Sequence, residues 1–449
     1  MPMKLSAARV TFQHWLMALL LCAPVLAQQK MVTSSEPLPE PKLDKPLIGQ
    51  PFFDPVFGTR VMRLTDAQTN NSKGYVCYYP KLDPCNANDT RLLIYERGGA
   101  WHLYEIDGTY VGRAPIRNGQ TDPQPRWHPT DPNIIYWFDA NKIMQYDFST
   151  RRTTVIHQFP PYEFITAFDE GNFSADGRLV AFAGRKWPWF TGLQEFQVFD
   201  LSSKIRVGKL IEGTGHEVDW VSMSPSGKYM VIHVGRPHGA GLWQGLDVYR
   251  LTEMDYVPHG YFEFSAHADL GFDAAGNEVY VTDSPETPYP DRLRHVEMFQ
   301  LENGHKTDLL GMAWGLSRLV SCRNFAAPGW AIISTYGSPE HLAESRVHPF
   351  DDEIFALKLD GSYEVRRIAH HRSQRFSVGD YSYNNYWDQP NAAISRSGKY
   401  ILFSSNWREL GAPQDVFLID LSNQDGWITD QPDLDDGPPT PPQNVRIEP

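Results

Sequence analysis

A repeated strand–turn pattern constrains the fold of this chain more than any other feature. Most copies have a polar turn that ends in Gly, followed by an apolar run rich in β-branched and aromatic residues, and the second copy has Pro129–Pro132 in place of that turn. The clearest turns are Ser174–Gly177, Ser224–Gly227, Asp273–Gly276 and Ser395–Gly398. A strand-rich repeat of roughly 40–50 residues is typical of a β-propeller, so we predict an all-β fold of that kind.

Seven copies of the pattern can be placed on the sequence, which predicts a seven-bladed β-propeller. The expected blades cover residues 76–115, 122–159, 170–210, 217–262, 264–310, 319–369 and 385–428. A ring that stays open exposes sheet edges, so we expect the alternating run Thr59–Thr65 to complete the last blade as its outer strand. A six-bladed ring is the alternative, if the first segment is an irregular cap.

The composition supports a large folded domain and argues against a nucleic-acid partner. The chain has 449 residues, of which 41% are hydrophobic and 13% aromatic, and this suffices for an extensive core. The formal net charge is −13, whereas non-specific nucleic-acid binding needs a basic surface.

The N-terminal residues 1–27 have the parts of a secretory signal peptide. Lys4 and Arg9 provide a basic region, an apolar run follows, and Val25–Ala27 gives a small-residue cleavage pattern. The apolar run is shorter than the ~20 residues of a membrane span. We therefore expect a bacterial protein that is secreted or periplasmic and has no membrane span after signal removal.

Proline-rich segments flank the predicted propeller. We expect a Pro-rich arm or linker at 28–55, the propeller at 56–430 and a Pro-rich linker or tail at 431–449. We also expect a monomer. Cys77 and Cys85 are close enough in sequence to form a disulfide in an oxidising compartment, while Cys322 is either a buried small hydrophobe or a metal ligand.

Common catalytic motifs, such as a phosphate-binding loop or a Gly-x-Ser-x-Gly elbow, do not occur in the chain. A propeller nevertheless predicts where polar groups converge, because its innermost strands surround one axis. Aligning these strands by their turns gives Arg126, Asn172, Trp220, Asp269, Arg323 and Asn391, with His216, His267, Asn324 and Gln389 nearby. The structural alternative is that these side chains only hydrogen-bond one another.

His267 and Asp269 form the sharpest local cluster. They are two residues apart, so in a strand both side chains face the same side. They could share a divalent metal, with His216 or Cys322 completing the site. They could also form a His–Asp pair that raises the basicity of His267, or make an inter-blade hydrogen bond.

The segment from His370 to Pro390 is too long for a tight connection between blades, and long loops in compact domains are often functional. It mixes cationic and aromatic side chains, namely Arg372, Arg375, Tyr381, Tyr383, Tyr386 and Trp387. Such a surface suits sugars, whose rings stack on aromatic side chains while their carboxylates bind Arg.

The Ser-x-x-Gly repeats over residues 76–428 resemble the TolB-type, WD40-like propellers of bacterial envelope proteins. Secreted propellers of this style include polysaccharide lyases, and Trp387–Pro390 followed by Ile394–Trp407 resembles the last-blade segment of the oligogalacturonate lyases. That resemblance implies a His-containing metal site there, but the chain has no His between Tyr381 and Asn406, so those ligands are not carried over. The ulvan lyases, which imply catalysis by His, Tyr and Arg without a catalytic metal, fit these residue types better.

The resemblance implies a polysaccharide lyase that cleaves uronate-containing glycans by β-elimination. An Arg beside the uronate carboxylate stabilises the developing enolate, and a His or Tyr removes the adjacent proton. For these roles we predict Arg323 or Arg126, then His267 or His216 as base, with Tyr386 protonating the leaving oxygen. The predicted substrate contacts are Asn172, Trp220, Asn324, Arg375, Trp387, Gln389 and Asn391.

Two other functions remain open from the sequence. The chain could be a non-catalytic propeller that binds a glycan or an envelope protein. A glycoside hydrolase needs paired carboxylates, for which Asp269 with Asp388 or Asp219 is the visible choice. The expected partner in each carbohydrate function is an acidic polysaccharide or oligosaccharide.

Overall fold

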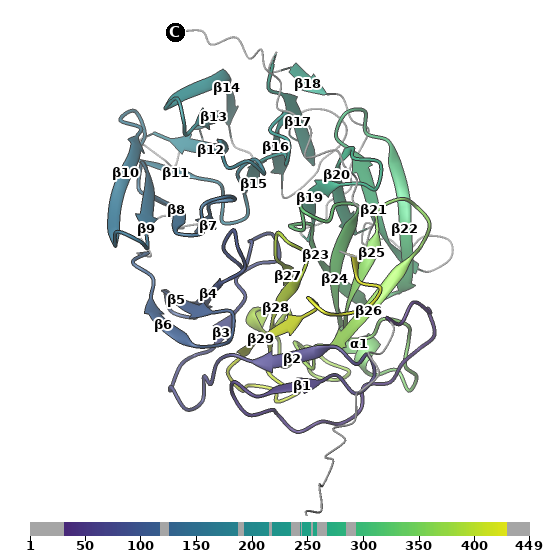
Figure 1. Ribbon diagram of the computed structural model, residues 1–449. Helices are drawn as coiled ribbons and strands as arrows, with labels where there is room; N and C mark the ends of the chain where they lie inside the picture. Colours follow the sequence, from purple (N-terminus) through teal and green to yellow (C-terminus); the bar gives the residue numbers. More distant parts are fainter. Residues whose placement is uncertain are drawn as a thin grey trace, which may run out of the picture.

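The chain forms a ring of seven β-sheets arranged around a central axis, as the computed structural model in Figure 1 shows. The seven-bladed all-β propeller predicted from the repeats is confirmed, and the six-bladed alternative is excluded. The structure describes residues 31–116, 125–186, 193–214, 218–234, 243, 245–252, 255–257, 267–283 and 293–428.

The first three blades have four antiparallel strands each, named below in order from the axis outward. Blade 1 contains β3 (Tyr75–Val76), β4 (Arg91–Glu96), β5 (Ala100–Glu105) and β6 (Tyr110–Arg113). Blade 2 contains β7 (Arg126–Trp127), β8 (Ile134–Asp139), β9 (Lys142–Asp147) and β10 (Arg152–Gln158). Blade 3 contains β11 (Phe164–Thr166), β12 (Leu179–Arg185), β13 (Leu193–Asp200) and β14 (Ile205–Thr214).

Blades 4 to 6 repeat this order. Blade 4 contains β15 (Val218–Met223), β16 (Tyr229–Val234), β17 (Leu246–Arg250) and β18 (Asp255–Val257). Blade 5 contains β19 (Asp269–Phe272), β20 (Glu278–Asp283), β21 (Leu293–Gln300) and β22 (Lys306–Ala313). Blade 6 contains β23 (Leu316–Ser321), β24 (Trp330–Gly337), β25 (Glu353–Lys358) and β26 (Val365–His370), with the short helix α1 (Pro339–Leu342) between β24 and β25.

The N-terminal part of the chain closes the ring in blade 7. This blade contains β27 (Ala393–Ile394), β28 (Tyr400–Ser405) and β29 (Asp415–Asp420), to which β2 (Arg60–Arg63) and β1 (Pro51–Phe53) are added on the outside. Strand β2 pairs antiparallel with β29, with Met62 opposite Leu418. The predicted closure by the strand within Thr59–Thr65 is therefore confirmed.

The repeated Ser-x-x-Gly turns connect the first and second strands of their blades. In blade 3, the backbone N–H of Gly177 donates to the carbonyl of Ser174, and Gly177 has a φ of +72°, where a side chain is strained. The same bond recurs at Ser224–Gly227 and Ser395–Gly398. The backbone of this turn requires Gly, which is why the blade repeat is visible in the sequence.

Residues 31–50 lie along the outside of blades 6 and 7 and do not add a blade of their own. Val32 makes an isolated antiparallel bridge with Arg367 of β26, and the indole N–H of Trp407 donates to the carbonyl of Leu43 at 2.9 Å. The predicted signal at 1–27, the start of the arm at residue 28 and the predicted tail at 431–449 lie outside the described residues.

The three described cysteines are free and buried. Cys77 and Cys85 pack with Leu92 and Leu402 in the apolar core between blades 1 and 7, so the disulfide considered for them does not form. Cys322 is a buried small hydrophobe, and burial raises the pKa of its thiol. Among the described residues, no helix is long and apolar enough to cross a membrane.

The closing strand β2 contributes side chains to two cores. Removing a buried side chain from it should therefore destabilise the whole ring. Met62 is 4% exposed and packs in the core shared by blades 7 and 1. We expect Met62→Ala to lower the free energy of unfolding by about 2–5 kcal/mol in urea denaturation. The neighbouring Arg60→Ala, which removes a surface ion pair with Asp420, should cost at most about 1 kcal/mol. Equal losses for the two variants would contradict a structural role for the closure.

Candidate functional site

The polar side chains aligned from the inner strands all lie close to the axis of the ring. Each is buried, with exposed fractions between 0% and 7%, and they come from blades 2 to 7: Arg126, Asn172, Trp220, Asp269, Arg323 and Asn391. The structure therefore brings these residues together. Their contacts, however, divide them into groups that hold the backbone and groups that face a common site.

Arg126 holds a segment of blade 3 in place. Its Nε donates to the Asn172 side-chain oxygen and to the Gly171 carbonyl, both at 3.0 Å, and Nη1 donates to the Pro125 carbonyl. Burial and the nearby charge of Arg323 lower the pKa of Arg126 to about 9. The N–H groups of this guanidinium group therefore bind backbone carbonyls of the protein itself.

Arg323 forms a bidentate ion pair with Asp269. Its Nε and Nη2 donate to the two carboxylate oxygens at 3.0 and 2.6 Å, and the same carboxylate accepts from the backbone N–H groups of Leu270 and Cys322. His267 instead places its Nδ1 3.4 Å from the Tyr79 hydroxyl. Within the described residues, His267 and Asp269 do not belong to a common metal-binding group, and His216 lies outside those residues.

The remaining predicted residues have distinct surroundings. The Asn324 side chain donates to the carbonyls of Ala327 and Trp330 and so fixes the turn after β23. Asn391 is fully buried at a φ of +45°, and its side-chain oxygen and nitrogen have no hydrogen-bond partner among the described residues. The Gln389 amide donates to the Tyr336 hydroxyl at 2.9 Å.

Two inner strands are interrupted by inserts that reach the axis. In blade 1 the pairing stops after β3 and resumes at the bridge between Cys85 and Leu92, which leaves 77–84 as an insert. In blade 3 it stops after β11 and resumes at the bridge between Phe173 and Val180, which leaves 167–172 as a second insert.

The two inserts bind each other across blade 2, which lies between them in the ring. The Tyr78 hydroxyl donates to Asp169 at 2.9 Å, and Lys81 forms an ion pair with Glu170 at 2.5 Å. The Asn172 amide donates to the backbone carbonyl of Lys81 at 2.9 Å. Together these contacts fix the position of a buried Lys and a partly buried Glu at the axis.

The blade 3 insert is locally strained. Phe168 and Asp169 have φ values of +61° and +67°, in the left-handed region that non-Gly residues rarely adopt. Strain of this kind persists only where surrounding contacts enforce it, and it is concentrated at functional sites. The insert therefore points to function at the end of the axis where Glu170 lies.

A set of titratable side chains from five blades and the blade 6–7 loop surrounds Tyr79, and we call it the axial site. Its members are Tyr79, Lys81, Glu170, Asp219, His267, Tyr336, Arg375 and Tyr386. Burial raises the pKa of Tyr79 well above its usual value, and the charges of Glu170 and Asp219 add to the effect. The ring of Trp220 lies beneath Lys81, whose Nζ is 4.3 Å from its centroid.

The loop that joins blades 6 and 7 contributes Arg375, Tyr386 and Trp387. The Arg375 Nη1 donates to the Tyr336 hydroxyl at 2.9 Å, and its guanidinium lies 5.9 Å from the ring of Tyr386. Tyr386 and Trp387 begin the 3-10 turn η2 (Tyr386–Asp388). The ring of Trp387 lies next to that of Tyr95 in β4, and their centroids are 6.1 Å apart.

The surroundings of the axial site shift the pKa values of its titratable groups in different directions. Burial lowers the pKa of His267 to about 4, and the charges of Arg375 and Lys81 add to this effect. Burial raises the pKa of Glu170 to about 7 despite the Lys81 ion pair. Although burial favours the neutral acid, the hydrogen bond from His233, at 3.1 Å, lowers the pKa of Asp219. Such divergence is typical of functional sites.

Sequence reasoning missed Tyr79, Lys81, Glu170 and Tyr336. One position per inner strand, counted back from the turn, reaches Asn172 but not the other insert residues or Tyr336 of β24. The available signal was the length between β3 and β4, where Tyr78–Pro84 is too long for a tight turn.

The comparisons with known proteins agree with this architecture. No protein-family model and no curated protein sequence matches the chain. Among solved structures, an oligogalacturonate lyase in complex with manganese superposes with a TM-score of 0.59 at 15% identity, over 88% of this chain and 97% of that chain. An oligogalacturonate lyase from Vibrio parahaemolyticus gives a TM-score of 0.54 at 12% identity, over 83% and 96%.

The chain shares a propeller fold with these two structures. A third structure, the Pan2 WD40 domain of Neurospora crassa, has a TM-score of 0.45 at 13% identity, over 78% of this chain and 94% of that one. At these identities the likeness shows the fold alone.

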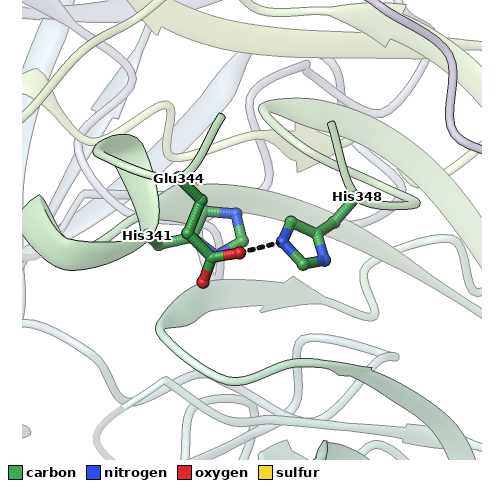
Figure 2. A group of neighbouring side chains, drawn as sticks. All are labelled: His341, Glu344 and His348. Carbon is green, nitrogen blue, oxygen red and sulfur yellow. Dashed lines mark hydrogen bonds and ion pairs between the residues drawn. The ribbon is translucent and has the colours of Figure 1, made fainter. Parts of the chain in front are cut away.

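The last-blade segment is a poor match for a transition-metal site. Gln389 and Asn391 offer amide oxygens there, and both oxygens lack hydrogen-bond partners among the described residues. The carboxylate of this segment, Asp388, already accepts hydrogen bonds from Tyr383 and Gln414, and carboxamides alone form a weak donor set for such an ion. The described residues do contain one group of His and Glu that could hold a metal ion, His341, Glu344 and His348, shown in Figure 2.

The close approach of the blade 3 insert to blade 4 should be sensitive to a single methyl group. A Cβ at Gly171 would lie 1.9 Å from the Val221 carbonyl oxygen, a contact that backbone cannot relieve cheaply. We expect Gly171→Ala to destabilise the protein by more than about 2 kcal/mol in urea denaturation. The comparison variant Gly276→Ala meets no atom within 4 Å and should cost only about 1 kcal/mol, from its positive φ. A smaller loss for Gly171→Ala than for Gly276→Ala would contradict this packing.

Proposed function

We propose that the protein binds a uronate-containing glycan at the axial site and cleaves it by β-elimination. The observation that carries this proposal is the meeting of a guanidinium group, an imidazole with a depressed pKa and a phenol around one point: Arg375, His267 and Tyr386. These are the three kinds of group that the reaction needs. The fold likeness to oligogalacturonate lyases supports the same reading.

Arg375 is the better candidate for binding the uronate carboxylate than Arg126 or Arg323. It is partly exposed, and its Nη2 has no hydrogen-bond partner among the described residues. The guanidinium groups of Arg126 and Arg323 are already bonded to backbone carbonyls and to Asp269. A cation beside the carboxylate stabilises the negative charge that develops when the adjacent proton leaves.

In the proposed reaction His267 removes the proton from the carbon next to the carboxylate. The electrons of that C–H bond form a double bond to the neighbouring carbon, and the bond from that carbon to the glycosidic oxygen breaks. The leaving oxygen takes a proton from Tyr386. Burial, together with the charges of Glu170 and Tyr336, raises the pKa of Tyr386 to about 12, so the phenol carries its proton at neutral pH.

The aromatic side chains beside the axial site suit the rings of a glycan. Tyr386 is 45% exposed, and Trp387 contacts both Tyr386 and Tyr95 edge-on or at a tilt. Sugar rings stack on such surfaces, and Lys81 and Arg97 add positive charge nearby. The proposed partner is an acidic polysaccharide or oligosaccharide, bound by a monomer that the N-terminal signal directs to the periplasm or the medium.

A glycoside hydrolase is a second candidate, supported by one observation. The Glu170 pKa is raised to about 7, that of the nearby Asp219 is lowered, and their charges interact. A protonated and an ionised carboxyl on one site are the pair used in glycoside hydrolysis. The two products differ, because hydrolysis creates no double bond.

Incubation with a panel of uronate polysaccharides tests the proposal, because elimination produces an unsaturated uronate that absorbs ultraviolet light. We expect kcat/KM to fall about 10²–10³-fold in Arg375→Gln and about 10²–10⁴-fold in His267→Ala. Arg113→Gln, on the outer strand β6 with a side chain 70% exposed, is the matched control and should keep full activity.

Each alternative has its own outcome in this assay. New reducing ends without ultraviolet absorbance would indicate hydrolysis, and retention of intact glycan without cleavage would indicate a binding protein. Wild-type elimination rates in both His267→Ala and Arg375→Gln would overturn the assigned roles.

The pH dependence of kcat/KM should report the unusual imidazole. As the base, His267 must be unprotonated, and its pKa in the free protein is lowered to about 4. Activity should therefore be retained as the pH falls past 6 and be lost only near pH 4, since kcat/KM reflects groups of the free enzyme. An acid limb centred near 6.5, the ordinary value for His, would exclude His267 as a buried base.

A further inference from the structure

We propose that His341, Glu344 and His348 bind one divalent transition-metal ion such as Zn²⁺ at the rim of blade 6. The ligand atoms of these three residues all lie within 4.8 Å of one another. Figure 2 shows the His348 ring beside the Glu344 carboxylate, and the centroids of the two imidazoles are 4.9 Å apart. The site lies between β24 and β25, and none of its ligands belongs to the axial site.

The chain gathers these ligands over a short stretch. His341 lies in α1, which begins after the N-cap Ser338, and the chain then turns back so that His348 and Asp351 face the helix. His341 Nε2 lies 2.7 Å from Asp351 Oδ1, and His348 Nε2 lies 2.6 Å from Glu344 Oε2. The Nε2 atom of each imidazole thus already faces a carboxylate oxygen.

The donor set suits a borderline divalent ion. Imidazole nitrogen and carboxylate oxygen are ordinary Zn²⁺ ligands, and three such groups with a water molecule in the fourth position form a tetrahedral site. The other ring nitrogen of His341, Nδ1, lies 3.4 Å from the carbonyl oxygen of Trp314. A metal-ligating His commonly donates its second N–H to a backbone carbonyl, which fixes the ring and the tautomer.

A bound ion would take the place of the hydrogen bonds that now join the two imidazoles to carboxylates. The Glu344 side chain is 41% exposed and that of His348 is 11% exposed, so an ion can enter from solvent. Metal binding should release protons and weaken at acidic pH.

The site is separate from the axial site but mechanically connected to it. Tyr336 bonds Arg375 and Gln389, whereas the adjacent Gly337 faces His341, because successive residues of β24 point to opposite sides. The N–H of Gly379 donates to the Pro339 carbonyl at 2.9 Å. The ion would therefore stiffen the segment against which the Arg375 loop packs; any effect on catalysis rests on the proposed function.

Titration of the chelator-treated full chain with Zn²⁺ in a calorimeter tests the site without any glycan. We expect one ion per chain, and at least tenfold weaker binding in His348→Gln and in Glu344→Gln. With Co²⁺ the wild type should show the intense visible absorption of a tetrahedral site, which the variants lose. His305→Gln, which removes an exposed histidine in the turn between β21 and β22, is the matched control and should bind as the wild type does.

Two results would overturn the proposal: no binding of Zn²⁺ or Co²⁺ to the wild type, or equal binding by the wild type and both ligand variants. Circular dichroism of the metal-free variants separates lost ligands from lost folding, and Glu344→Gln changes a side chain that is largely at the surface. Failure of this titration leaves the glycan assay unaffected, since the two experiments share no reagent.

Discussion

The pairing of β2 with β29 is the constraint on which the rest of the structure depends. It joins the two ends of the chain in one sheet, and its residues enter two cores, with Val61 in the core of blades 6 and 7 and Met62 in that of blades 7 and 1. No blade can cover both of its apolar faces alone. Closure therefore gives every inner strand a fixed direction toward the axis, where side chains far apart in the sequence can meet.

The two inserts place charged side chains at the axis of the closed ring. They replace paired inner strand in blades 1 and 3, and they bring Lys81 and Glu170 together at the axis. A buried ion pair contributes little net stability, because the loss of hydration offsets the attraction of the charges. The left-handed backbone at Phe168 and Asp169 is likewise unfavourable by itself, so contacts such as this ion pair must hold the insert in place.

The repeat made the propeller, its seven blades and its closing strand predictable, because the clearest turns carry Gly at a positive φ and each blade needs its neighbours. The axial location of Arg126, Asp269 and Arg323 also followed from the inner-strand alignment. Their partners could not be predicted in this way, since a contact such as that of Tyr79 with His267 spans 188 residues. A guanidinium group in an inner strand looks the same in the sequence whether it binds a carbonyl or awaits a ligand.

The central claim is that Arg375, His267 and Tyr386 surround one bound uronate. A crystal structure of His267→Ala with a uronate oligosaccharide tests it most directly, because the variant should bind its substrate without cleaving it. The account predicts a carboxylate on the Arg375 guanidinium and a sugar ring against Tyr386 or Trp387. An oligosaccharide bound elsewhere on the ring, with the axial site free of it, would contradict the account.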